Sequence, residues 1–194
     1  MRGLEQIGWL YDGVMSIGDR FGLRDWRRWL VRGAYGRTLE VGVGTGRNLP
    51  LFTSEARVIG LEPTRDVLHR ARRRLPGVRL VVGRAEAMPF REGVFDTVVT
   101  SLVFCSVGDV PRGLSEVRRV LAPHGKLRML EHVRSTNRLW SLVQDGIQPL
   151  WTRLTGGCHP NRRTEEAVTA AGFEIEAMGR AAQGTLRRFS AHKS

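Results

Sequence analysis

Residues 38–50 read TLEVGVGTGRNLP, an apolar run that leads into three closely spaced glycines. The run 38–43 is short, aliphatic and nearly continuous, which predicts a strand buried on both faces. The glycines at 42, 44 and 46 let the backbone turn tightly against a ligand before a helix begins. Arg47 stands where a dinucleotide-binding motif needs glycine, and no Gly-Lys-Ser/Thr sequence follows, so the usual pyrophosphate cradles are disfavoured.

Strand-like and helical patterns alternate outward from this stretch. Turn and capping residues such as Thr64, Pro111 and Gly172 mark the helix ends. Seven strands are predicted, at 38–43, 57–61, 78–82, 95–102, 126–131, 173–178 and 185–191. Helices are predicted at 65–75, from 111 to the turn at 122–125, and at 161–170. This alternation predicts an α/β fold, a mostly parallel seven-stranded sheet with helices on both faces.

Two segments fall outside the alternation. Residues 4–32 carry apolar residues at helical spacing among arginines, and residues 137–158 form an apolar insertion after the fifth strand. We therefore expect a single domain over 1–194, with an N-terminal helical cap (1–36), a cofactor-binding core (37–132), a helical insertion (133–160) and a C-terminal helix with strands (161–194). Such additions commonly lie over the carboxyl ends of parallel strands, where ligands bind.

The composition is that of a globular protein, with 41% hydrophobic and 26% charged residues in 194. No apolar run approaches the roughly 20 residues that cross a bilayer, and no signal peptide is evident. We expect a cytoplasmic protein. The net charge of +12 favours anionic lipid or nucleic acid as partners, although only two of the 31 basic residues are lysines, a bias that genome composition can produce.

Cys105 and Cys158 match no metal or CxxC spacing, so we expect no metal site and no disulfide. We expect both to be small buried residues instead.

The downstream motifs follow a recognisable order. The second strand ends in GLEP (60–63), the third is followed by GRAEAMPF (83–90), and the fourth leads into VFCS (103–106). Over residues 38–132 this series, with its acidic-x-Gly-x-Gly-x-Gly loop, resembles the Rossmann-like class I S-adenosylmethionine-dependent methyltransferases. The stretches TSLVFCSV (100–107), MLEHV (129–133) and GGCHPNRRT (156–164) are similar to membrane-associated thiol methyltransferase-like proteins and to bacterial phospholipid and quinone methyltransferases.

The resemblance implies roles for individual residues. Glu40 lies near the methionine amine, Glu62 holds the ribose hydroxyls, and Tyr11 covers the cofactor carboxylate. Adenine lies between Ala85 and Glu86. The predicted set of cofactor-binding residues is Tyr11, Glu40, Gly42, Gly44, Thr45, Gly46, Asn48, Glu62, Pro63, Ala85, Glu86, Ser101, Leu102 and Ser106. Arg84 departs from the family, which usually has an aspartate there, and arginine cannot accept the adenine amino hydrogen. Either the backbone alone reads adenine or Glu86 supplies the carboxylate.

The acceptor implied by the resemblance is small or lipid-like and hydrophobic: a phospholipid amine, a quinone or a thiol. The Asn/Asp-Pro-Pro-Tyr/Phe motif of nucleic-acid and protein amino methyltransferases is absent, since Ser101 to Phe104 stand in its place. His132 and His159 are the candidates for removing a proton from the acceptor. A peripheral contact with an anionic membrane is expected. The alternatives are an RNA methyltransferase, suggested by the charge, and a non-catalytic cofactor-binding protein at a membrane surface.

Overall fold

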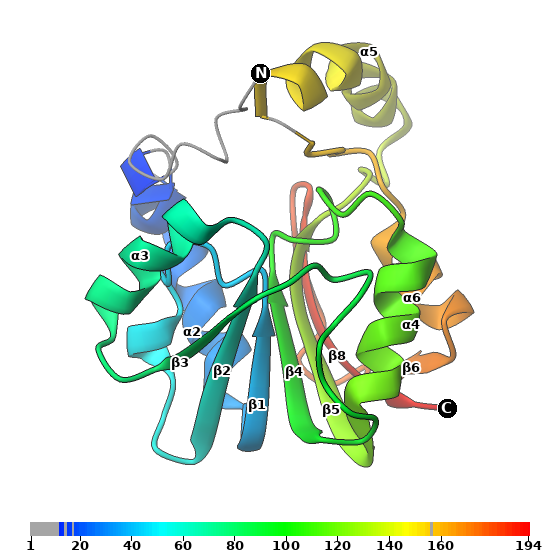
Figure 1. Ribbon diagram of the computed structural model, residues 1–194. Helices are drawn as coiled ribbons and strands as arrows, with labels where there is room; N and C mark the ends of the chain where they lie inside the picture. The colour runs from blue at the N-terminus through cyan, green and yellow to red at the C-terminus, as the bar shows by residue number, and fades with distance from the viewer. Residues whose placement is uncertain (1–11, 14, 17, 156) are drawn as a thin grey trace.

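The computed structural model describes residues 12–13, 15–16, 18–155 and 157–194. Its described part contains an eight-stranded mixed sheet (Figure 1). The strands are β1 (Gly36–Val41), β2 (Ala56–Glu62), β3 (Arg79–Val82), β4 (Phe95–Ser101), β5 (Leu121–His132), β6 (Phe173–Ile175), β7 (Ala181–Gln183) and β8 (Leu186–Lys193). The helices are η2 (Asp19–Leu23), α2 (Arg24–Arg32), η3 (Leu49–Leu51), α3 (Arg65–Arg74), α4 (Val110–Val120), α5 (Arg138–Thr155) and α6 (Thr164–Ala170).

The strand order is β3-β2-β1-β4-β5-β8-β6, and β7 pairs with β8 beside β6. Strands β1 to β5 are mutually parallel, whereas β8 runs antiparallel to β5, β6 and β7. The mostly parallel α/β sheet is therefore confirmed, but the count of seven was one too low. The extra strand, β7, is a three-residue arm of a hairpin that turns at Gly184, where φ is +56°. A run so short and largely exposed leaves no hydrophobic pattern to detect.

Adjacent residues of the central strands supply the two faces of the sheet. On β4, Val98 faces the larger core beneath α4 and α6, while Val99 faces the opposite core beneath α2. Arg128 of β5 reaches into this second layer. Its guanidinium donates to the carbonyls of Trp29 and Leu30 at 2.6 Å each, and so satisfies the last turn of α2. Helices thus cover both faces of the sheet. The carboxyl ends of the parallel strands stay uncovered by these helices and can form a binding site.

Helix α5 lies beyond this edge of the sheet, at the top of Figure 1. Its buried side chains are polar: Ser141, Gln144 and Thr155. Gln144 donates to the carbonyls of Val133 and Pro160. The large exposed side chains of α5 are apolar: Leu139, Trp140, Leu142, Val143, Ile147, Leu150, Trp151 and Leu154. The helix therefore packs on the protein through polar groups and presents its apolar face outward, the reverse of an ordinary surface helix. Among the described residues, no helix is long and apolar enough to cross a membrane.

Candidate functional site

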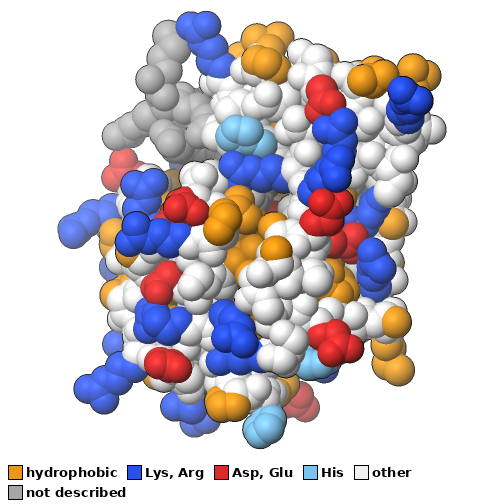
Figure 2. All heavy atoms as spheres, turned by 90° about the vertical axis from the view of Figure 1, so that its right-hand side faces the viewer, with side chains coloured by type: hydrophobic (Ala, Val, Ile, Leu, Met, Phe, Trp, Pro, Cys, Tyr) orange, Lys and Arg blue, Asp and Glu red, His pale blue; other side chains and the backbone are white. Residues whose placement is uncertain are grey.

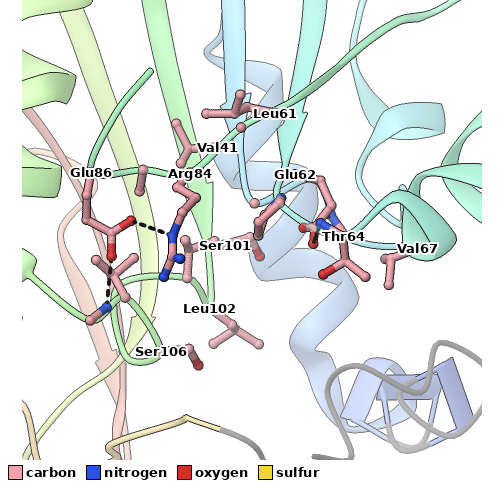
Figure 3. Close-up of a pocket in the computed structure, with 18 of the residues that line it drawn as sticks. Val41, Leu61, Glu62, Thr64, Val67, Arg84, Glu86, Ser101, Leu102 and Ser106 are labelled. Atoms are coloured by element: carbon pink, nitrogen blue, oxygen red, sulfur yellow. Dashed lines mark hydrogen bonds and ion pairs between the residues drawn. The ribbon is translucent and has the colours of Figure 1, made fainter. Parts of the chain in front are cut away.

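A cavity of about 310 Å³ opens at the carboxyl ends of β1, β2 and β4 (Figure 3). It lies where open α/β sheets bind ligands, at the point where the strand order reverses between β1 and β4. Ten predicted cofactor residues line it: Gly42, Gly44, Thr45, Glu62, Pro63, Ala85, Glu86, Ser101, Leu102 and Ser106. Tyr11 lies outside the described residues. The cavity is also lined by residues that were not in the predicted cofactor-binding set, among them Thr64, Val67 and Val103.

Glu62 ends β2 and points into the cavity (Figure 3). Its Oε2 accepts from the backbone N–H of Gly44 at 3.3 Å, and its Oε1 accepts from that of Thr64 at 3.1 Å. Burial raises the pKa of this carboxyl, while these hydrogen bonds oppose the rise. A carboxylate has about four acceptor positions, and the Thr64 side chain also donates to Glu62, so one position remains for a ligand hydroxyl. This geometry suits a hydroxyl of a ribose.

Each glycine of the loop is required for a different structural reason. Gly42 has φ +65°, and a Cβ there would lie 2.5 Å from Val103 Cγ2. A Cβ at Gly44, with φ +55°, would meet only the carbonyl of Gly42 at 3.8 Å, so this position faces open space. Gly46 does not line the cavity; a Cβ there would meet Ala71 of α3 at 2.8 Å. Gly46 therefore lets the loop pack on α3, and the other two shape the wall of the cavity.

Glu40 lies beside the main cavity, on a smaller one of about 20 Å³ that it shares with Gly44, Asn48 and Ser101. Asn48 donates to Glu40 Oε1 at 2.8 Å, and the buried Arg27 donates to Asn48 Oδ1 at 3.0 Å. Glu40 Oε2 is buried and has no hydrogen-bond partner. Burial raises the pKa of Glu40 to about 7, against the hydrogen bond from Asn48 and the nearby charge of Arg27. An ammonium group in the small cavity would satisfy this oxygen and stabilise the carboxylate.

Asp12, in the N-terminal segment of the chain, contacts the glycine loop and holds it in place. Its carboxylate accepts from Thr45 Oγ1 at 2.7 Å and pairs with Arg74 at 2.7 Å. Arg47, the residue that departs from a dinucleotide motif, donates to the carbonyl of Asp12 at 3.1 Å and pairs with Asp19. Arg47 therefore links the loop to the segment before α2. The sequence pattern marked the segment as helical but did not show these contacts.

At the adenine end, Glu86 is held by the protein itself. Its Oε1 accepts from Gly108 N at 3.1 Å, and Arg84 Nε lies 3.8 Å from its Oε2 (Figure 3). The carboxylate is therefore engaged in joining the loop after β3 to the start of α4. Both Ala85 and Glu86 line the cavity, and the two alternatives for reading adenine stay predictions.

The opposite end of the cavity is formed by the loop after β4. Leu102 has φ +59°, a strained conformation for a residue other than glycine, and its N–H donates to Leu130 O at 2.7 Å. The buried Glu131 supports the same loop, because its Oε1 accepts from Thr100 Oγ1 at 2.9 Å and Val103 N at 3.1 Å. Burial raises the pKa of Glu131 to about 7, against these hydrogen bonds. Glu131 thus positions the loop and does not line the cavity.

The two candidate bases lie outside the lining of this cavity. His132 contacts the Cys158 thiol. His159 Nδ1 lies 2.7 Å from the carbonyl of Gly157 and 3.3 Å from Arg162 Nη2. Both therefore belong to the layer between the loop after β4 and α5. The same layer brings Cys105 and Cys158 together, although their spacing in the sequence suggested no relation.

The residues present fit S-adenosylmethionine. The Glu62 carboxylate, with one free acceptor position, is placed for a ribose, and the buried Glu40 oxygen without a partner is placed for an amine. The cavity between them is walled on one side by backbone that only glycine adopts readily. Among the described residues, no group of three or more His, Cys, Asp or Glu side chains is arranged to hold a metal ion.

Comparison with known proteins points the same way. The family pattern described as "Methyltransferase domain" matches residues 39–129. Human thiol S-methyltransferase TMT1B is 35% identical over 162 residues, 77% of this chain and 66% of that protein. A demethylmenaquinone methyltransferase of Renibacterium salmoninarum is 34% identical over 129 residues, 63% of this chain and 53% of that protein. The chain thus spans between half and two thirds of these curated relatives. A solved S-adenosylmethionine-dependent methyltransferase of Thermotoga maritima shares the fold, with a TM-score of 0.67 at 22% identity over 95% of this chain and 98% of that one.

Proposed function

Because the chain belongs to the family of S-adenosylmethionine-dependent methyltransferases, we propose that it transfers a methyl group to a hydrophobic acceptor that it meets at a membrane surface. The single observation that supports this acceptor class is α5, which turns its apolar face away from the protein. Transfer to a thiol, a quinone or a phospholipid amine is compatible with such a surface. Relatives named for each of these three acceptors match the chain.

The cofactor brings a methyl group on a positively charged sulfur, so the protein needs mainly to align an acceptor and exclude water. Glu62 would hold the ribose and Glu40 the amine, which fixes the cofactor along the edge of the sheet. The loop 101–106, held by Glu131, would then stand beside the methyl group. We do not assign a base among the residues that line the cavity, because an acceptor thiol can ionise in solution near neutral pH.

The outward face of α5 carries the proposed membrane contact. In Figure 2, hydrophobic side chains lie together with basic ones at the end of the molecule where α5 is found. Arg138 and Arg153 stand at the two ends of the helix, and its single acidic residue, Asp145, is paired with Arg134 at 2.7 Å. An apolar face with basic residues and no unpaired acid suits the interface of an anionic lipid bilayer. This is the basis for proposing peripheral association.

Methyl transfer from labelled S-adenosylmethionine into a whole-cell extract tests the acceptor class. The products are separated into organic, aqueous and RNA fractions. Label in the organic fraction supports the proposal and allows the product to be identified by mass. Label in RNA, together with binding that weakens steeply with salt, would instead support an RNA methyltransferase. No label in any fraction, with cofactor binding intact, would favour the non-catalytic alternative.

Vesicle binding tests the membrane contact separately. Trp140 and Leu150 are 63% and 64% exposed on α5, and Met178 is 88% exposed elsewhere. Inserting a large apolar side chain into lipid contributes about 1.5–3 kcal/mol, so replacing both Trp140 and Leu150 by Ser should weaken binding to anionic vesicles by at least about a hundredfold. The matched variant Met178→Ser should bind like the unmodified protein. Equal binding by both variants would contradict the assignment of α5.

A further inference from the structure

The two cysteines lie 53 positions apart in the sequence and meet in the fold. Cys105 belongs to the loop after β4, and Cys158 to the connection between α5 and α6. Both are reduced and almost fully buried, with 1% and 3% of their surface exposed. The Cys158 thiol is hydrogen-bonded to that of Cys105 and also contacts the side chains of His132 and Trp151. The expectation that both are small buried residues is confirmed, whereas their contact was not predicted.

The backbone around the pair is fixed on both sides. The N–H of His159, next to Cys158, donates to the carbonyl of Cys105 at 2.7 Å. The carbonyl of Cys158 accepts from Thr152 Oγ1 at 2.8 Å, and its N–H donates to Thr155 Oγ1 at 3.3 Å. Two residues held side by side in this way can be joined without a large movement of the chain, which is what disulfide geometry requires.

The surroundings of Cys158 favour its reactive thiolate form. Contact with Cys105, together with the His132 ring, outweighs burial and lowers the pKa of Cys158 to about 4. Arg162 adds positive charge near both sulfurs. A thiolate, rather than a thiol, is the form that peroxides and disulfides oxidise. Because both sulfurs are buried, a bulky oxidant such as oxidised glutathione is hindered more than a small one.

We propose that Cys105 and Cys158 are a modification site at which hydrogen peroxide introduces a reversible disulfide. The Cys158 thiolate attacks one peroxide oxygen, the O–O bond breaks, and hydroxide leaves, which gives a sulfenic acid on Cys158. The Cys105 sulfur then attacks the sulfenic sulfur, the S–O bond breaks, and water leaves with the Cys105 proton. Two thiols lose two electrons in total, and one peroxide becomes two waters. A small thiol reductant reverses the change by exchange.

The disulfide would hold the segment before α6 against the loop after β4, which lines the cavity. Ser106, which follows Cys105, lines the cofactor cavity. Gly157, which precedes Cys158, lies directly against it, since a Cβ at Gly157 would be 3.5 Å from Ser106 O. An acceptor that enters between this loop and α5 needs the two to separate, and the bond prevents that. This consequence rests on the proposed function, whereas formation of the bond does not.

Mass spectrometry of the full chain after peroxide treatment tests the site. The chain has two cysteines, so an intramolecular disulfide can only join this pair, and non-reducing electrophoresis separates it from a linked dimer. We expect a product lighter by two hydrogens that dithiothreitol reverses. In Cys105→Ser, a sulfenic acid should accumulate on Cys158 and be trapped by dimedone. In Cys158→Ser, Cys105 should react about tenfold more slowly, because the His132 ring contacts Cys158.

A second pair of variants covers the case in which a cysteine variant folds poorly. His132→Gln should slow disulfide formation about tenfold, while His124→Gln, at an exposed position near the opposite end of β5 from His132, should leave the rate unchanged. Absence of an intramolecular disulfide in the unmodified protein, or equal reactivity of the two cysteines, would overturn the proposal. Oxidation should also leave S-adenosylhomocysteine affinity within about twofold and lower methyl transfer until dithiothreitol restores it. Unchanged transfer by the oxidised protein would refute the effect on acceptor entry alone.

Discussion

Replacement of Glu62 by Gln tests the centre of the proposed cofactor site. Glu62 already accepts from the backbone N–H of Gly44 at 3.3 Å, from that of Thr64 at 3.1 Å and from the Thr64 side chain, and it keeps one acceptor position for a ribose hydroxyl. The variant replaces one of these oxygens by an NH₂ group, which accepts nothing. One charge-assisted bond to the ligand is lost, and such bonds contribute about 1.5–3 kcal/mol. The affinity for S-adenosylhomocysteine should therefore fall by about ten- to a hundredfold.

Isothermal titration calorimetry measures this change, with Glu55→Gln as the matched control. Glu55 is exposed just before β2, and its backbone carbonyl, not its side chain, bonds to Gly36. A ligand that lacks the ribose 2′-hydroxyl gives the decisive comparison. It should bind the unmodified protein more weakly than S-adenosylhomocysteine does, but the two ligands should differ much less on Glu62→Gln. An affinity within twofold of the unmodified protein, or an undiminished effect of the missing hydroxyl, would refute the ribose assignment.

Three further changes have definite expected results. Glu40 has a higher pKa when folded, about 7, than the ordinary 4.5, so it contributes stability that is fully present below pH 4.5 and is lost as the pH rises through 7. Glu40→Gln should therefore flatten the melting temperature of the cofactor-free protein between these pH values, yet weaken S-adenosylhomocysteine binding in calorimetry. Gly42→Ala should lower the free energy of unfolding in urea more than Gly44→Ala, because both have positive φ but only the first meets a side chain at 2.5 Å. Arg128→Met should destabilise by about 2–3 kcal/mol in the same assay, since two carbonyls of α2 lose a charged donor.

The cofactor half of the molecule was predictable because its signals are local. A buried parallel strand is a continuous aliphatic run, and a tight turn needs glycine, so β1 and the loop after it could be located from residues 38–46 alone. Glu62 was predicted from the family resemblance, and the structure places it on the cavity. Gly46 shows the limit of this reasoning. It belongs to the motif, but the structure places it against Ala71, away from the ligand cavity.

What the sequence did not indicate depends on contacts between distant segments. The strand β5 begins at Leu121, five residues earlier than expected, because its first residue pairs with Phe95 across a register shift in the sheet. The outward apolar face of α5 could not be inferred from its pattern, since an amphipathic helix has the same periodicity whichever face is buried. The meeting of Cys105 and Cys158 depends on where α5 ends, which no local pattern determines.

The position of β8 bears on the order in which the chain acquires structure during synthesis. Residues 186–193 are the last strand in the sequence, yet they lie inside the sheet, with β5 on one side and both β6 and β7 on the other. The five parallel strands can pair as they leave the ribosome, but β6 and β7 have no partner until β8 emerges. During translation the half formed by β1 to β5 can thus form early, whereas the free edge of β5 stays open to other chains until β8 emerges.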